Sequence, residues 1–157
     1  MERYTLPEIA NIWSEENKFT IWLNIEIFAC EANNKLGIVP SKALRNIKSR
    51  AKFNVKKINE IESVVKHDVI AFLTNVEEYV GEPSRYIHLG MTSSDVLDTC
   101  LSVQLKQAGE ILLSDLERLK QALIIKAKEY KYTVCIGRSH GIHAETMTFG
   151  LKFALWL

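Results

Sequence analysis

The sequence predicts an all-α fold, in which an N-terminal helical domain precedes the first long helix of a central helical bundle. One observation is the scarcity of chain-breaking residues: seven glycines and three prolines in 157 residues are about half the usual share. A second is an unbroken helical repeat of apolar residues from Ser94 to Tyr130. We expect domains at residues 1–93 and 94–157, the second one incomplete, because the apolar end at Leu157 carries no helix stop.

The composition is that of a soluble globular protein, with 47% hydrophobic and 25% charged residues. Twenty basic residues nearly cancel 19 acidic ones, which argues against nucleic acid or a membrane surface as the partner. The three cysteines show no Cys-x-x-Cys spacing, so a reduced cytoplasmic protein is favoured over a disulfide scaffold. No apolar run is long enough to span a membrane, and the first residues do not form a signal peptide.

The first helices are predicted from their caps and stops. Pro7 opens a short helix that ends near Trp13, and Ser14 is the predicted N-cap of a longer helix that ends at Gly37. Apolar residues alternate over positions 21–27 as they would in a strand. The flanking residues and the Gly37 stop nevertheless favour a helix.

Shorter helices follow this segment. Ser41 is the predicted N-cap of one, and helical spacing marks two more, at 55–65 and 68–80. Residues 81–84 form a predicted turn, and residues 88–92 form a loop.

The strongest element is the long helix predicted over 94–130. Its apolar residues recur in steps of four and three, an 11-residue repeat of about 3.67 residues per turn. At 1.5 Å per residue it is roughly 50 Å long, so its apolar stripe needs other long helices from the same chain or from other subunits. The stripe consists of Leu97, Leu101, Leu105, Ala108, Leu112, Leu116, Leu119, Leu123, Ala127 and Tyr130.

The last part of the chain is predicted to contain a break and then a further helix. The break covers residues 132–141, and the helix begins near Ala144 with Met147, Leu151 and Leu155 on one face.

Four histidines are candidates for proton transfer, because imidazole exchanges protons near neutral pH. They are His67, His88, His140 and His143, and a structural role is the commoner one for any single histidine. His140 and His143 have the spacing of a metal pair, but only Glu145 could join them as a ligand, so no metal site is expected.

Two short segments combine several polar groups. Residues 92–95, Thr-Ser-Ser-Asp, precede the long helix and suit either a helix cap or an anion site. Residues 137–141, Gly-Arg-Ser-His-Gly, bring together a cation, a hydroxyl and an imidazole. They suit either a functional site or a tight interhelical turn. Residues 32–59 carry eight Lys or Arg and no acid, a pattern more typical of a solvated helical face than of a nucleic-acid site.

Taken in order, these segments resemble the N-terminal part of the adenylosuccinate lyase family, within the fumarase/aspartase superfamily. The resemblance covers essentially the whole chain, and its segments are jointly far more specific than any of them singly. They are Glu2–Tyr4, Trp13–Glu31, Lys66–Phe72, His88–Thr99, Gly137–Glu145 and Phe149–Lys152.

The resemblance implies a β-elimination in purine biosynthesis, without a cofactor or a metal. Fumarate would leave adenylosuccinate to give AMP, and would also leave the succinyl-carboxamide intermediate of the pathway. The resemblance assigns His140 as the general acid that protonates the departing nitrogen. The substrate-binding residues that it implies are Arg3, Tyr4, Lys66, His67, Asp68, His88, Thr92, Ser93 and Ser139.

The resemblance also implies that the site is incomplete in this chain. The serine base would lie beyond Leu157, the intact protein would be a homotetramer, and three subunits would contribute to each active site. We therefore expect a small-molecule nucleotide as substrate, copies of the same chain as partners, and little or no turnover by residues 1–157 alone.

Alternative functions remain open at this point. Argininosuccinate lyase belongs to the same superfamily, although the Arg3-Tyr4 and His67-Asp68 segments resemble the nucleotide-specific branch. A non-catalytic helical module could instead bind nucleic acid through residues 42–57, with a steep salt dependence.

Overall fold

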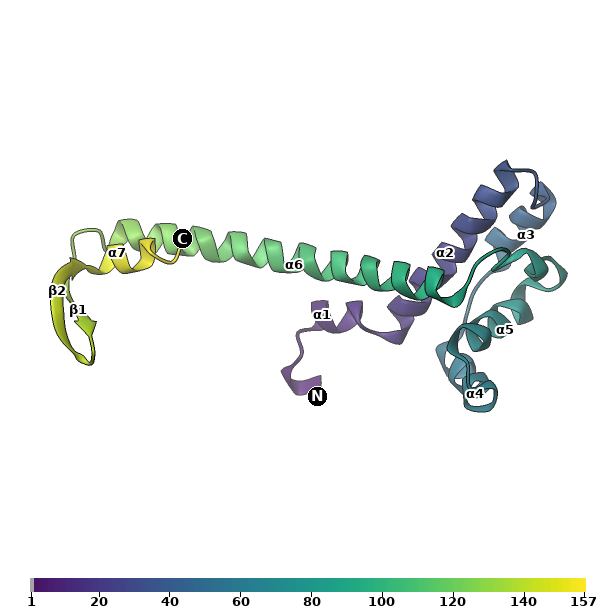
Figure 1. The fold of residues 1–157 in the computed structure, drawn as a ribbon, viewed down its shortest axis with the longest axis horizontal. Helices are drawn as coiled ribbons and strands as arrows, with labels where there is room; N and C mark the ends of the chain where they lie inside the picture. Colours follow the sequence, from purple (N-terminus) through teal and green to yellow (C-terminus); the bar gives the residue numbers. More distant parts are fainter. Residues whose placement is uncertain (1) are drawn as a thin grey trace. The chain divides into compact units, whose positions relative to one another are not determined.

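The computed structural model describes residues 2–157 and is mostly helical, which confirms the all-α prediction (Figure 1). The chain divides into two compact units, one ending at Ala108 and one beginning at Gly109. None of the helices within residues 2–157 is long and apolar enough to cross a membrane. The helices are η1 (Glu2–Tyr4), α1 (Pro7–Ile12), α2 (Glu15–Lys35), α3 (Ser41–Arg50), α4 (Val55–Val65), α5 (Asp68–Val80), η2 (Glu82–Tyr86), α6 (Ser93–Glu129) and α7 (Phe149–Ala154), and the strands are β1 (Val134–Ser139) and β2 (Ile142–Thr148).

Side-chain caps fix the starts of several helices in the first unit. The Ser14 hydroxyl accepts the Asn17 N–H at 3.2 Å, which confirms Ser14 as the N-cap of α2. The alternating apolar residues of α2 lie in this helix and not in a strand. The prediction for Ser41 is wrong, because Pro40 occupies the N-cap position of α3 and makes no side-chain bond.

The core of the first unit is built around aromatic rings. Phe19 and Trp22 of α2 meet Phe72 of α5, with ring centroids 5.2–5.7 Å apart and edge-to-face or stacked geometry. Phe53, in the connection before α4, lies 6.0 Å from Phe19. This cluster packs α2 against α5, the helix that begins directly after the predicted site residues Lys66 and His67.

Helix α6 begins in the first unit and continues into the second. One face of its first turns is buried, since Val96 and Cys100 are 0–2% exposed, whereas Ser94, Asp95, Asp98 and Thr99 are exposed. Further along, the apolar stripe predicted from the 11-residue repeat is exposed at five leucines. These are Leu101, Leu105, Leu112, Leu116 and Leu119, between 49% and 59% exposed.

The prediction of a break followed by a helix near Ala144 is wrong. β1 and β2 pair antiparallel as a hairpin, with Val134 opposite Thr148 and Ser139 opposite Ile142. β-branched residues at both ends of the hairpin favour this extended backbone. Helix α7 begins only at Phe149, where the Thr148 hydroxyl accepts the Leu151 N–H at 3.3 Å.

Helix α7 packs against the end of α6 within the second unit (Figure 1). The Gly150 N–H donates to the Tyr130 carbonyl at 2.9 Å, and the rings of Phe149 and Phe153 contact that of Tyr130. A Cβ on Gly150 would lie 2.4 Å from the Ala127 carbonyl oxygen. The absence of a side chain at Gly150 therefore permits this close approach.

Candidate functional site

The start of α6 presents two hydroxyls and free backbone N–H groups. The Thr92 N–H donates to Asp95 Oδ2 at 2.8 Å, and the Asp95 N–H donates to the Thr92 carbonyl at 3.0 Å. The bond to the Asp95 carboxylate is one half of a capping box and holds the first turn, while the Asp95 N–H bonds to the Thr92 carbonyl and not to its hydroxyl. The Asp95 carboxylate is committed to Thr92, so the N–H groups of Ser93 and Ser94 remain at a helix N-terminus, where anions are favoured.

Lys66 and His67 connect α4 to α5, and Asp68 is the first residue of α5. Lys66 ends α4 with a left-handed backbone, φ 56°. His67 caps α5, because its Nδ1 accepts the Ile70 N–H at 3.4 Å, and it lies 3.6 Å from Asp68 Oδ1. Since Nδ1 is used as an acceptor, Nε2 is the ring nitrogen that His67 can offer to a ligand.

Arg3 and Tyr4 form a pair at the start of the described chain, in η1. The Arg3 guanidinium contacts the Tyr4 hydroxyl and lies 4.8 Å from the centre of its ring. Both residues are exposed, so a cation and a phenol are presented together at the surface of the first unit.

His88 is held by a buried carboxylate of α2. Its Nδ1 lies 2.6 Å from Glu26 Oε1, and its backbone N–H donates to Glu26 Oε2 at 2.8 Å. Glu26 is 1% exposed, and the His88 side chain is 20% exposed. One carboxylate therefore fixes both the backbone and the ring of His88, which has φ 64°.

Two further residues of α2 contact the backbone on either side of His88. The Cys30 thiol donates to the Tyr86 carbonyl at 3.3 Å, and the Asn33 amide reaches the Leu89 carbonyl at 3.5 Å. Burial, together with the nearby charge of Glu26, raises the pKa of the Cys30 thiol to about 11. Cys30 therefore remains a neutral donor at physiological pH.

Ser139 and His140 lie at the tip of the hairpin in the second unit. His140 and Gly141 form its two-residue turn, with φ values of 50° and 77°. Two successive left-handed residues are the mark of a type I′ turn, which matches the twist of a hairpin. The turn exposes the imidazole of His140 together with the neighbouring Ser139.

The predicted site residues of the first unit form three separate groups: Arg3–Tyr4, Lys66–Asp68, and His88 with Thr92–Ser93. Within residues 2–108, no hydrogen bond or ion pair joins one group to another. Two of these groups, those of Lys66 and His88, share a backbone feature with the hairpin. Among residues 2–157, the only non-glycine residues with positive φ are Lys66, His88 and His140, and such backbone outliers concentrate at functional sites.

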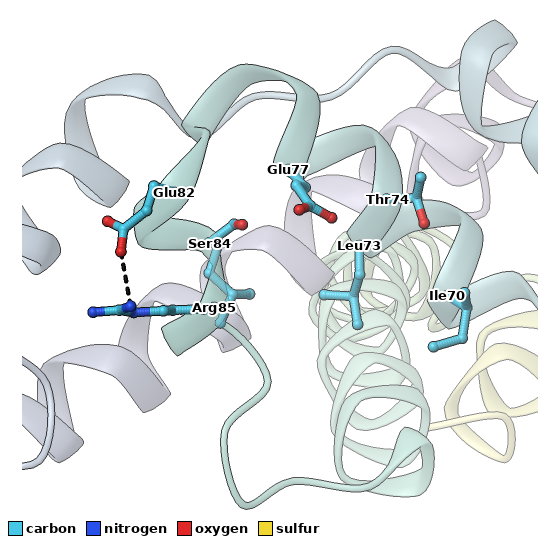
Figure 2. A pocket seen from close by; sticks show the side chains of 8 residues that line it. Ile70, Leu73, Thr74, Glu77, Glu82, Ser84 and Arg85 are labelled. Atoms are coloured by element: carbon cyan, nitrogen blue, oxygen red, sulfur yellow. Dashed lines mark ion pairs between the residues drawn. The ribbon is translucent and has the colours of Figure 1, made fainter.

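A pocket of about 310 Å³ lies between α5 and η2 in the first unit. Figure 2 shows an ion pair, 2.9 Å long, between Glu82 and Arg85 at this pocket. Glu77 gives the lining a net negative charge, which disfavours an anionic ligand. None of the predicted site residues lines it; the lining consists of Ile70, Leu73, Thr74, Glu77, Glu82, Ser84, Arg85 and Ile87.

Residues 2–157 contain no group of three or more His, Cys, Asp or Glu side chains placed to hold a metal ion. In particular, His143 pairs with Arg138 across the hairpin, while His140 occupies the turn.

Glu26, the buried partner of the candidate residue His88, is not among the residues that the sequence predicts for the site. It lies on the buried face of α2 with Phe19, Trp22 and Cys30. Steps of three and four residues join these positions, so the helical repeat places a carboxylate where an apolar residue is expected. A charged residue in a core position is the signal that could have identified it.

The chain is similar to known lyases over its whole length. A family model described as "Lyase" matches residues 2–157. The adenylosuccinate lyase of Synechocystis sp. is 55% identical over 157 residues, and that of Bacillus subtilis is 51% identical over 156 residues. These residues are 36% of each relative, so the chain spans about a third of the length of the curated relatives it matches.

A solved structure shares the fold of this chain. The fumarate lyase from Mesorhizobium sp. BNC1 superposes with a TM-score of 0.89 at 24% identity. The match covers 94% of this chain and 36% of the other.

Proposed function

Because the chain belongs to the lyase family, whose model matches residues 2–157, we propose that it supplies the N-terminal part of an adenylosuccinate lyase. The observation that carries the proposal is the identity of 51–55% to two adenylosuccinate lyases along the whole chain. The reaction would release fumarate from adenylosuccinate and from the succinyl-carboxamide intermediate of purine biosynthesis, in the cytoplasm.

The chemistry is a β-elimination. A base removes a proton from the carbon beside a carboxylate, and the electron pair of that C–H bond forms the carbon–carbon double bond of fumarate as the carbon–nitrogen bond breaks. The nitrogen takes up a proton and leaves as an amine. The step needs a proton donor at the nitrogen and hydrogen-bond donors at the carboxylate, where negative charge develops. We assign the base to no residue of this chain.

His140 is the proposed proton donor to the leaving nitrogen. Imidazole carries and releases a proton near neutral pH, as this step requires. The type I′ turn holds His140 at the hairpin tip, where its ring is exposed. Ser139 precedes it on β1 and would contact the same part of the substrate.

Thr92 and Ser93 are the proposed site for the succinyl carboxylates. Their hydroxyls and the N–H groups of the first turn of α6 are donors, and the dipole of this long helix favours anions at this end. Asp95 holds the turn by accepting the Thr92 N–H, so these donors would be oriented before the substrate binds.

The other proposed contacts suit a substrate with a phosphate and two carboxylates. Lys66 and Arg3 provide positive charge, and Tyr4 provides a hydroxyl. His67 and His88 each have Nδ1 engaged within the protein, which leaves Nε2 as their ring nitrogen for the substrate. Asp68 fixes the start of α5, because its Oδ1 accepts the Val69 N–H at 2.7 Å.

The exposed leucines of α6 support a further part of the proposal, a homotetramer built on the long helices. Residues 94–157 would then be the start of the bundle domain, and residues 1–93 the N-terminal domain. Apolar stripes of this length are covered by other helices in stable assemblies.

The test is a chimeric lyase, in which residues 1–157 replace the matching segment of the Bacillus subtilis enzyme. We expect it to convert adenylosuccinate to AMP and fumarate, as followed by ultraviolet absorbance. A chimeric lyase that assembles like its parent but leaves adenylosuccinate intact contradicts the proposal. Turnover of argininosuccinate instead would assign the other branch of the superfamily.

A further inference from the structure

Glu26 makes an unusual contact for a core position of a helix. Its carboxylate is 1% exposed and reaches a residue 62 positions later, with Oε1 at 2.6 Å from His88 Nδ1 and Oε2 at 2.8 Å from the His88 backbone nitrogen. Both oxygens are therefore used by one residue. No other ionisable side chain contacts His88 within residues 2–157.

Packing alone does not account for a carboxylate here. Burial of a carboxylate costs several kcal/mol unless its partners compensate, and an apolar side chain of similar size is often as stable or more stable in such a place. The neighbouring buried positions of α2 hold Phe19, Trp22 and Cys30. The distinctive effect of Glu26 is thus on His88 and not on the core.

That effect is to fix the orientation and the protonation pattern of the imidazole. A carboxylate at Nδ1 requires a proton on Nδ1, so the neutral ring has an unprotonated Nε2. The second oxygen holds the His88 backbone in a left-handed conformation, which is disfavoured for a residue with a Cβ. The ring is thereby held in one pose, and its side chain remains 20% exposed.

We propose that Glu26 is a positioning residue, which fixes the tautomer and the orientation of His88 so that Nε2 faces the substrate of the lyase. This inference rests on the proposed function for its consequence in catalysis. Its structural part, the Nδ1–H tautomer of His88, stands apart from any turnover.

The first test is ¹⁵N NMR of the 157-residue chain with labelled histidine. The chain has only four histidines, and His88→Gln assigns the signal. In buffer alkaline enough for neutral imidazoles, we expect the Nδ1–H tautomer for His88 and its loss in Glu26→Leu. Glu31→Leu is the matched control, since Glu31 lies on the same helix and pairs with Lys48 at the surface. The same His88 tautomer in wild type and in Glu26→Leu overturns the inference, whatever the lyase activity.

The second test is a double-mutant cycle in the chimeric lyase. Glu26→Leu is expected to lower kcat/KM by about 10- to 100-fold, because small misplacements of a positioned group have effects of this size. In a His88→Ala background it should have almost no further effect, and Glu26→Gln, which keeps one acceptor, should fall between. Additive losses, or losses that only follow the fraction of unfolded protein, contradict the role. A chimeric lyase that is inactive before any substitution refutes the proposed function and leaves the tautomer measurement decisive for Glu26.

Discussion

A left-handed backbone occurs at Lys66, His88 and His140. Each of these residues has a side chain suited to bind an anionic or basic group of a ligand. Such a backbone is disfavoured by roughly 1–2 kcal/mol for a residue with a Cβ, so the surrounding structure must hold it in place. His88 is held by Glu26, Lys66 by the end of α4, and His140 by the hairpin. At the scale of the residue, local strain and proposed function therefore coincide.

Lys66→Gly separates the effect of the strained backbone at this position from the effect of the Lys66 side chain on substrate binding. Glycine relieves the strain but gains freedom in the unfolded chain, and the two effects are of similar size, about 1 kcal/mol. We expect the thermal unfolding midpoint to change little, whereas the KM of the chimeric lyase for adenylosuccinate rises. A variant that loses stability but keeps its KM would assign Lys66 a purely structural role.

Cys30 predicts a pH dependence of stability. The folded protein holds the pKa of this thiol at about 11, above its ordinary value of 9.0, chiefly through burial. The unfolded chain therefore loses this proton first, and the free energy of unfolding falls as the pH rises from 9 towards 11. Urea unfolding over this range should show a smaller fall for Cys30→Ala than for wild type. Equal slopes for the two proteins would contradict a buried neutral thiol.

At the scale of the element, the helices of the first unit were predictable because their signals are local. Ser14 caps α2, and glycines follow α2 and α5. The hairpin was not predictable in this way, because β1 and β2 are largely exposed and lack the apolar alternation that a half-buried strand imposes on its sequence. The contact between Glu26 and His88 joins residues 62 positions apart, so no local pattern encodes it.

His140→Asn separates the structural role of His140 in the hairpin turn from its proposed role as the proton donor. Asparagine suits positive φ in a type I′ turn, so we expect the hairpin to form and the melting temperature to stay the same or rise. Turnover by the chimeric lyase should nevertheless fall by about 10²- to 10⁴-fold, the usual contribution of a general acid. Undiminished turnover with an intact hairpin would exclude His140 as the proton donor.

Gly150→Ala tests the packing of α7 on α6. The added Cβ would meet backbone atoms of Ala127 and Lys131 at 2.4–2.8 Å, and backbone atoms have no rotamer by which to move away. We expect α7 to detach, with a red shift in the fluorescence of Trp156, which lines a pocket together with Leu119 and Leu123 of α6. Wild-type fluorescence in the variant would contradict the close packing.

At the scale of the whole molecule, the exposed stripe of α6 predicts self-association. Five leucines between 49% and 59% exposed lie along this stripe, and a large exposed apolar patch is typical of an interaction surface. Sedimentation of the 157-residue chain should show oligomers, and Leu112→Glu with Leu119→Glu should shift them towards monomer. Leu113→Glu is the control, since this leucine is 68% exposed but lies outside the stripe. A wild-type chain that is monomeric at all concentrations would contradict a role for the stripe in assembly.

An ultraviolet assay of adenylosuccinate with the chimeric lyase and with its His140→Asn variant tests the substrate and the proton donor together. We expect AMP and fumarate from the first protein and almost none from the second, with both proteins folded and assembled alike. Equal turnover by the two proteins would contradict the assignment of His140. No turnover by an assembled wild-type chimera would contradict the assignment of the substrate.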